Sequence, residues 1–194
     1  KINLKKKKNK INAIVLSRIE YGKGHADLIE AFNFLSKKVR ENYKVHFVGK
    51  GDPQFKKYLN KKISKSSLRD NFSFTGFIQQ DSREIISNYD LLISPTRDFE
   101  GFGLSIAESL SVGVPVISTK VGGVLDYLDK RNSILVEPKS PKLLASSLEL
   151  FFNNRTKYQK KALLGKKLIQ NSFSEDKMSK NYVKHFNKIK KINV

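Results

Sequence analysis

Two glutamates and two glycines within one short stretch are the residues of this chain best suited to bind a ligand. The stretch EGFGLSIAE places seven residues between Glu100 and Glu108, and Gly101 and Gly103 follow the first glutamate. Glycine has no Cβ, so main-chain N–H groups in this loop can approach a ligand closely. A helical pattern begins at about Leu104, and the start of a helix favours an anion such as phosphate. Because carboxylates accept hydrogen bonds from hydroxyls, we expect a phosphate flanked by sugars.

The segments around this stretch have the order of a parallel-sheet crossover. An apolar run at residues 91–94 ends at Pro95 and leads into the loop, and the helical pattern covers residues 104–112. A second apolar run at residues 115–118 ends in a turn at Gly122 and Gly123. Strand, loop, helix and strand in this order are typical of parallel strands joined by a helix.

The rest of the chain continues the same alternation of strands and helices. Further strands are predicted at residues 11–17, 44–49, 72–77 and 133–138, and helices at 25–39, 55–63, 83–89, from 141 onward, 158–170 and 175–191. The sequence therefore predicts an α/β fold, a Rossmann-like parallel sheet of about six strands with helices on both faces. No internal repeat or low-complexity linker divides the chain, and we expect one domain over residues 1–194.

The EGFGLSIAE stretch, with Pro-Val-Ile and Gly-Gly downstream, resembles the donor-binding half of retaining GT-B glycosyltransferases of family 4, the glycosyl transferases group 1. The resemblance covers about residues 11–191. It implies a C-terminal, nucleotide-sugar-binding domain that lacks its N-terminal acceptor domain and is inactive alone. In GT-B enzymes the final helix crosses back toward the other domain. The implied function is sugar transfer with retention of anomeric configuration, in synthesis of cell-envelope polysaccharide or glycolipid.

The resemblance also assigns roles to individual residues. Arg18 and the pair Lys23-Gly24 match an arginine and a lysine-glycine that contact the donor diphosphate in the family. Glu100 is implied to hold the transferred sugar, and Glu108 to hold the ribose hydroxyls. Two cations beside a diphosphate stabilise the negative charge that grows on the leaving group. Arg18, Lys23 and Glu100 are therefore the expected catalytic residues.

Main-chain contacts complete the site that the resemblance implies. In the family, the loop after the first glutamate holds the sugar and its phosphate, a glycine turn lies near the phosphate, and the backbone after a Phe-x-Gly segment holds the nucleobase. The residues that match these positions are Gly49, Phe77, Ile78, Gly101, Phe102, Gly103 and Leu104. The chain departs from the family at Leu125 and Asp126, where proline and glutamate are usual, so the resemblance does not identify the sugar, the base or the acceptor.

The strong positive charge admits a second interpretation. The chain carries 38 Lys and Arg against 18 Asp and Glu, and its lysines gather at residues 5–8 and from 157 to 191. Such a charge suits an anionic surface, although lysine is alternatively the ordinary surface residue of this chain. The alternative function is a non-catalytic basic module that binds nucleic acid or an anionic membrane. The basic helices lack the interleaved aromatic residues of single-strand binders, so we expect peripheral membrane contact rather than nucleic acid.

Several other kinds of site find no support in the sequence. The chain has no cysteine, its three histidines lie far apart, and it contains no Asp-x-Asp pair, so we expect neither a metal nor a cofactor. The Gly-rich loops match neither a dinucleotide fingerprint nor a Walker motif. Absence of cysteine fits a reducing compartment, and we expect a cytoplasmic protein that contacts the inner face of the membrane.

Overall fold

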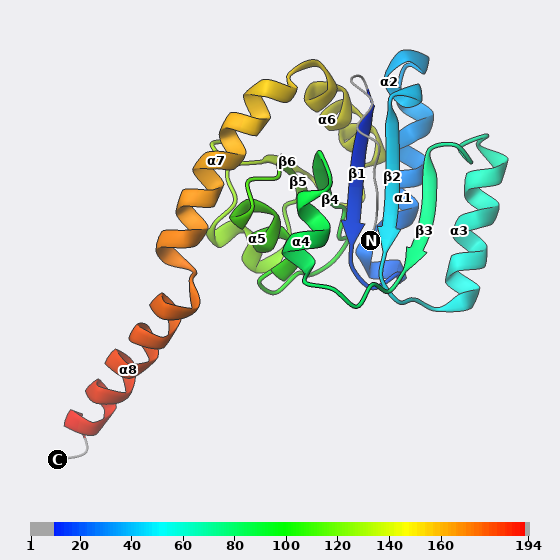
Figure 1. Ribbon diagram of the computed structural model, residues 1–194. Helices are drawn as coiled ribbons and strands as arrows, with labels where there is room; N and C mark the ends of the chain where they lie inside the picture. Colours follow the sequence, from blue (N-terminus) through cyan, green and yellow to red (C-terminus); the bar gives the residue numbers. More distant parts are fainter. Residues whose placement is uncertain (1–9, 193–194) are drawn as a thin grey trace.

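Six parallel strands form the centre of this computed structural model, which describes residues 10–192 (Figure 1). The strands lie in the order β3-β2-β1-β4-β5-β6. Their bounds are β1 Ile11–Leu16, β2 Tyr43–Val48, β3 Phe72–Gly76, β4 Leu91–Ser94, β5 Val116–Thr119 and β6 Ile134–Val136. The predicted α/β, Rossmann-like sheet is thereby confirmed, and each strand lies within about two residues of its predicted position.

Helices connect these strands and cover both faces of the sheet (Figure 1). The α-helices are α1 His25–Ala31, α2 Lys37–Glu41, α3 Pro53–Lys65, α4 Ser82–Ser87, α5 Leu104–Ser111, α6 Pro141–Asn153, α7 Arg155–Ser172 and α8 Glu175–Ile192. Short 3-10 helices occupy η1 Tyr21–Lys23, η2 Phe32–Phe34 and η3 Gly122–Asp126. The glycine pair at 122 and 123, predicted as a turn, thus begins a short helix.

Alternating side chains of the strands build one hydrophobic core on each face of the sheet. Ile11, Ala13 and Val15 of β1 face a core shared with α1, α3 and α6. Ile14 of the same strand faces a second core shared with α4, α5 and part of α7. Side chains in a strand point alternately to opposite faces, so apolar residues at successive positions specify a sheet that is buried on both sides.

The sheet order reverses at β1, and this reversal positions the candidate site. β1 pairs with β2 on one side, Ile14 opposite His46, and with β4 on the other, Ile14 opposite Leu92. Chain connections leave β1 and β4 in opposite directions along the sheet. The loops after these two strands therefore enclose a crevice at the carboxyl ends, which is where open α/β sheets bind their ligands.

One predicted helix is wrong in its extent. Residues 25–39 do not form a continuous helix, because α1 ends at Ala31 and Leu35 is extended, with ψ of 142°. Ser36 then caps α2 by accepting a hydrogen bond from the Val39 N–H. Phe32, Leu35 and Val39 all reach the core, so the helical spacing of apolar residues is compatible with two short helices separated by an extended link.

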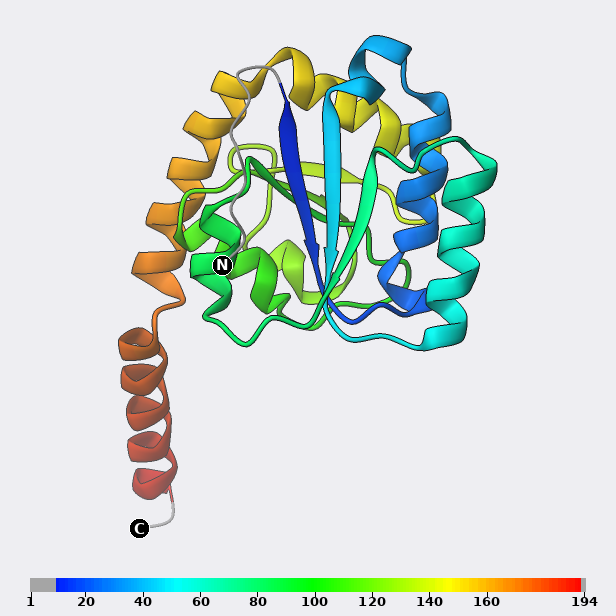
Figure 2. The same cartoon turned by 45° about the vertical axis from the view of Figure 1, so that its right-hand side comes forward.

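The last helix, α8, extends away from the sheet and the helices that cover it (Figure 2). Its large apolar side chains are solvent-exposed; they are Met178, Tyr182, Val183, Phe186 and Ile189. No helix within residues 10–192 is both long enough and apolar enough to cross a membrane. The lysines at positions 5–8, which contribute to the predicted charge at the amino end, lie outside the described residues.

Candidate functional site

A cavity of about 770 Å³ opens at the carboxyl ends of the strands, beside the point where the sheet order reverses. Its size lies within the range of ordinary small-molecule sites. The loops that follow β1, β2, β3 and β4 all contribute to its walls. Of the residues predicted from the sequence, those that line the cavity are Arg18, Lys23, Gly49, Phe77, Ile78, Glu100, Gly101, Phe102, Gly103, Leu104 and Glu108.

Gly24 is the one predicted site residue outside the cavity wall. It is buried, its φ is +72°, and a Cβ at this position would lie 1.8 Å from the carbonyl oxygen of Pro95. Only glycine fits such a left-handed conformation so close to another backbone segment. Gly24 thus lets the loop after β1 pack directly against the loop after β4, and it shapes the crevice without lining it.

The loop that begins at Glu100 rests on the glycine pair at the start of η3. Gly123 donates a hydrogen bond from its N–H to the Glu100 carbonyl oxygen over 2.9 Å. A Cβ on Gly122 would lie 2.0 Å from that same oxygen, and a Cβ on Gly123 would lie 2.2 Å from the Gly101 oxygen. The sequence predicted a turn at these glycines, whereas the structure shows that they support the loop that begins at Glu100.

An ion pair joins the loop after β1 to the loop after β4 at the cavity wall. Lys23 Nζ lies 2.7 Å from Glu100 Oε2, and the two side chains are 17% and 20% exposed. Thr96 donates a hydrogen bond from Oγ1 to the same carboxylate oxygen over 3.4 Å. The pairing of Lys23 with Glu100 concentrates both charges inside the cavity, where neither water nor salt screens them fully.

The second cation, Arg18, lies at the rim. Its guanidinium is 3.1 Å from the Glu20 carboxylate, and its side chain is 76% exposed. An exposed pair of this kind is weak, so the arginine is free to rotate toward an anion in the cavity.

Glu108 differs from Glu100 in having no competing partner. It lies on α5 and lines the cavity from the side of that helix. Within residues 10–192, no side chain makes a hydrogen bond or ion pair with its carboxylate. The carboxylate oxygens therefore keep their capacity to accept hydrogen bonds from a ligand.

An exposed aromatic ring, that of Phe77, forms part of the cavity wall. Phe77 is 62% exposed, and Lys50 Nζ lies 5.0 Å from the centre of its ring. The preceding Gly76 accepts a hydrogen bond at its carbonyl oxygen from the Gly49 N–H, over 2.9 Å. This bond joins the loop after β2 to the last residue of β3, so Gly49 lies beside the segment that leads to Phe77 and Ile78, and all three line the cavity.

A buried ion pair, which the sequence analysis missed, fixes the loops after β1 and β4. The Arg97 guanidinium binds Asp27 of α1 and lies 4.7 Å from the ring centre of Tyr21. The main-chain N–H of Arg97 also donates a hydrogen bond to the Gly22 carbonyl oxygen over 2.8 Å. Burial raises the pKa of Asp27, and the charge of Arg97 opposes that rise. These residues lie far apart in the chain and form no recognisable spacing, so no sequence signal could have found them.

Several polar side chains around the cavity were also not predicted. They lie near the ends of strands and the starts of helices, and Ser105 belongs to the EGFGLSIAE stretch itself; they are Ser17, Gln79, Gln80, Ser82 and Ser105. Position alone provided a signal, because Ser17 and Gln79 follow strands β1 and β3, whose carboxyl ends form the crevice. Among the described residues, no group of three or more His, Asp or Glu side chains is arranged to hold a metal ion.

Comparison with protein families gives one match that covers most of the chain. A family model described as glycosyl transferases group 1 matches residues 1–168. The C-terminal domain of a group 1 family glycosyl transferase, LpcC from Francisella tularensis, has a similar structure, with a TM-score of 0.75 and 27% identity. The match covers 85% of this chain and 87% of that domain.

Two further relatives extend this comparison. HepE from Anabaena, solved in complex with UDP, shares the fold with a TM-score of 0.85 at 21% identity, over 93% of this chain and 49% of HepE. The O-antigen biosynthesis glycosyltransferase WclY of Escherichia coli is 24% identical over 149 residues, which are 77% of this chain and 40% of WclY. The chain spans only 22% to 40% of the length of WclY and the other curated relatives compared with it.

Proposed function

This chain belongs to the glycosyl transferases group 1 family, and we propose that its cavity binds a nucleotide-diphosphate sugar as the donor domain of a GT-B enzyme. One observation carries the proposal: a cation, two carboxylates and a glycine loop at a helix start line one cavity at the carboxyl ends of the strands. A nucleotide sugar has a diphosphate between two sugars. The cation and the glycine loop suit the diphosphate, and the two carboxylates suit the hydroxyls of the two sugars. HepE, which shares the fold, binds UDP and UDP-glucose.

Each group has a proposed role that follows from its chemistry. Lys23 and Arg18 neutralise the diphosphate and the charge that develops on it during transfer. Main-chain N–H groups from Gly101 to Leu104 bind a phosphate at the start of α5. Glu108 accepts hydrogen bonds from the ribose hydroxyls, and Glu100 accepts them from the transferred sugar. With Lys23 and Arg18 as the source of positive charge, the reaction needs no metal or cofactor.

The nucleobase and the acceptor have separate proposed binding sites. The backbone of Phe77 and Ile78, which line the cavity after β3, holds the nucleobase. The acceptor binds in an N-terminal domain, and the exposed apolar side chains of α8 pack against that domain. Transfer retains the anomeric configuration, and the leaving phosphate helps to deprotonate the acceptor. By itself the chain binds donor and does not turn over, which a donor-hydrolysis assay checks.

The biological setting is part of the same proposal. O-antigen synthesis by WclY supports a role in cell-envelope polysaccharide or glycolipid synthesis. Such an enzyme works in the cytoplasm, where nucleotide sugars are available, and the net charge of +20 suits peripheral contact with the anionic inner face of the membrane.

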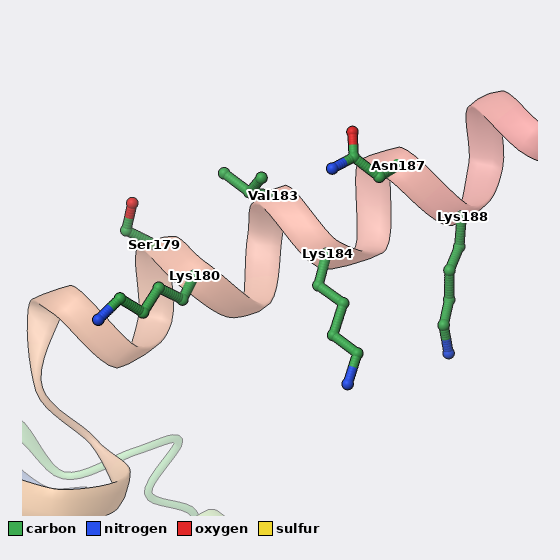
Figure 3. A pocket seen from close by; sticks show the side chains of 6 residues that line it. All are labelled: Ser179, Lys180, Val183, Lys184, Asn187 and Lys188. Carbon is green, nitrogen blue, oxygen red and sulfur yellow. The ribbon is translucent and has the colours of Figure 1, made fainter.

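A second candidate function rests on the basic surface of α8. Figure 3 shows Lys184 and Lys188 extending from the opposite side of this helix to Val183. A helix with one apolar and one basic side is typical of segments that bind an anionic membrane surface. In this case the chain would be a non-catalytic module for membrane or nucleic acid, and loss of Glu108 would not affect its binding.

Calorimetric titration separates the two functions. We expect UDP or GDP to bind with a dissociation constant between micromolar and low millimolar, and Glu108→Ala to weaken binding about tenfold or more because two hydroxyl contacts are lost. The matched control is Glu41→Ala, since Glu41 lies at the end of α2, before the start of β2 and away from the cavity. Absence of nucleotide binding, beside tight and salt-sensitive binding to anionic vesicles or DNA, would refute the donor-domain proposal.

A further inference from the structure

A buried tyrosine lies directly beneath the loop that we assign to the donor phosphate. Tyr127 follows η3 and is 3% exposed. Its hydroxyl donates to the carbonyl oxygen of Phe102 over 2.6 Å and lies 3.2 Å from the carbonyl oxygen of Gly103. A single side chain thus contacts two consecutive peptide groups of the loop.

Holding these carbonyls also sets the direction of the N–H groups in the same peptides. In a trans peptide the C=O and N–H bonds point in opposite directions, and the described residues contain no cis peptide. The carbonyl of Phe102 belongs to the same peptide as the N–H of Gly103, and the carbonyl of Gly103 to that of Leu104. With the Phe102 carbonyl toward Tyr127, the N–H of Gly103 points away from the tyrosine, and Gly103 lines the cavity. The Gly103 carbonyl is also held by α5, because it accepts hydrogen bonds from the N–H groups of Ile106 and Ala107 over 2.9 Å and 3.1 Å.

The surroundings of the ring keep it in place. Tyr127 packs against Phe102 and Phe173, with ring centres 5.1 Å and 5.6 Å away. Phe102 and Phe173 also contact each other, with ring centres 5.6 Å apart. Burial raises the pKa of the Tyr127 hydroxyl, and the charge of Glu100 raises it further, so the hydroxyl stays protonated and remains a donor at physiological pH.

We propose that Tyr127 is a positioning residue that orients the N–H group of Gly103 toward the donor diphosphate. The inference rests on the proposed function of the cavity. It gives Tyr127 a role through the loop rather than through contact with the ligand. Loss of the hydroxyl would let the Phe102–Gly103 peptide rotate, and binding of the phosphates would weaken while binding of the base and ribose would not.

The test compares two single-atom deletions. Tyr127→Phe removes the hydroxyl and keeps the ring. The control is Tyr43→Phe, because the buried Tyr43 hydroxyl also donates to a main-chain carbonyl, that of Leu148 over 2.8 Å, but at the start of β2 and away from the cavity. Titrations use UDP and uridine, or GDP and guanosine if the guanine nucleotide is the tighter ligand, and thermal melts verify folding.

We expect Tyr127→Phe to weaken UDP binding roughly threefold to tenfold, the equivalent of one hydrogen bond, and to leave uridine binding unchanged. Tyr43→Phe should lower the melting temperature and leave binding of both ligands unchanged. If Tyr127→Phe binds UDP as the wild type does, or loses uridine and UDP equally, the positioning role is wrong. If the wild type binds no nucleotide, the proposed function fails and this inference fails with it.

Discussion

In the free protein, the ammonium group of Lys23, which a donor diphosphate would use, is already paired with the carboxylate of Glu100. The two groups are 2.7 Å apart and only about one fifth of each side chain is exposed. A diphosphate that enters the cavity competes with the carboxylate for Lys23 or shares it. Glu100 therefore opposes binding of a bare nucleotide, and its contribution is favourable only when the transferred sugar offers hydroxyls to it.

The variant Glu100→Gln tests this competition. We expect it to bind UDP several-fold more tightly than the wild type, since removing a negative charge beside an anion site favours the anion. It should also lose most of the extra affinity that a UDP-sugar has over UDP in the wild type. Calorimetric titration of both ligands measures the two effects, and weaker binding of UDP to Glu100→Gln would contradict the competition.

His25, which follows Gly24 at the start of α1, makes stability depend on pH. It is fully buried, and burial, with the charge of Lys23 as a smaller cause, lowers its pKa from 6.5 to about 4. As the pH falls below 6.5, the unfolded chain takes up this proton first, so stability present above pH 6.5 is lost by pH 4. The loss is about 3 kcal/mol.

Urea unfolding at pH 7 and pH 4 measures this effect. His25→Leu should be less sensitive to acid than the wild type by about 3 kcal/mol. His185→Leu, at an exposed position on α8, should keep the wild-type dependence. An equal loss of stability on acidification in the wild type and His25→Leu would show that His25 does not titrate as its burial requires.

At the scale of elements, the sequence predicted the strands well because most of them are short apolar, β-branched runs, which are typical of strands in a sheet buried on both sides. It predicted the extent of the first helix badly, because the spacing of Phe32, Leu35 and Val39 fits a continuous helix as well as the broken one observed. A local signal was present in Ser36, a residue type that favours the position before a helix.

The candidate site was predictable to the extent that its residues belong to a motif. Lys23 and Glu100 were selected separately, and the structure joins them in an ion pair. Arg97 and Tyr127 were not selected, because their partners lie 70 and 25 residues away in the chain and only folding brings them together. Residues that act through packing or through another backbone segment leave little trace in the sequence.

The contact between η3 and the loop at Glu100 yields a prediction at this scale. Gly122 has a φ of +58°, and a Cβ would lie 2.0 Å from the Glu100 oxygen, so Gly122→Ala should cost about 2 kcal/mol or more of folding free energy and weaken UDP binding. Gly22→Ala is the control, because a Cβ there meets nothing within 4 Å. Chemical denaturation of both variants measures the difference, and equal stabilities would refute the supporting role of Gly122.

At the scale of the whole molecule, α8 contributes little to the folded body in this chain. Its apolar side chains are exposed, Phe186 for example by 59%, and the helix extends away from the sheet (Figure 1). In the function proposed above, this surface packs against the N-terminal acceptor domain.

The cost in folding free energy of replacing one phenylalanine in α8 and one in the core shows how much each region contributes to stability. Phe186→Ser should change the free energy of unfolding by no more than about 0.5 kcal/mol, as expected for a surface position. Phe32→Ser, at a position with no exposure, should cost about 3 kcal/mol or more. Urea unfolding of both variants measures the two costs, and a large loss for Phe186→Ser would mean that α8 packs against the rest of this chain.

The most direct test of the donor site is nuclear magnetic resonance of the labelled chain during titration with UDP or GDP. Amide shifts should change at residues that line the cavity: 17, 18 and 23 after β1, 77–80 after β3, and 100–105 after β4. Shifts in α8 should stay unchanged. Changes confined to the basic helices α3, α7 and α8, with the cavity segments unaffected, would contradict the account and favour a module that binds polyanions through its surface charge.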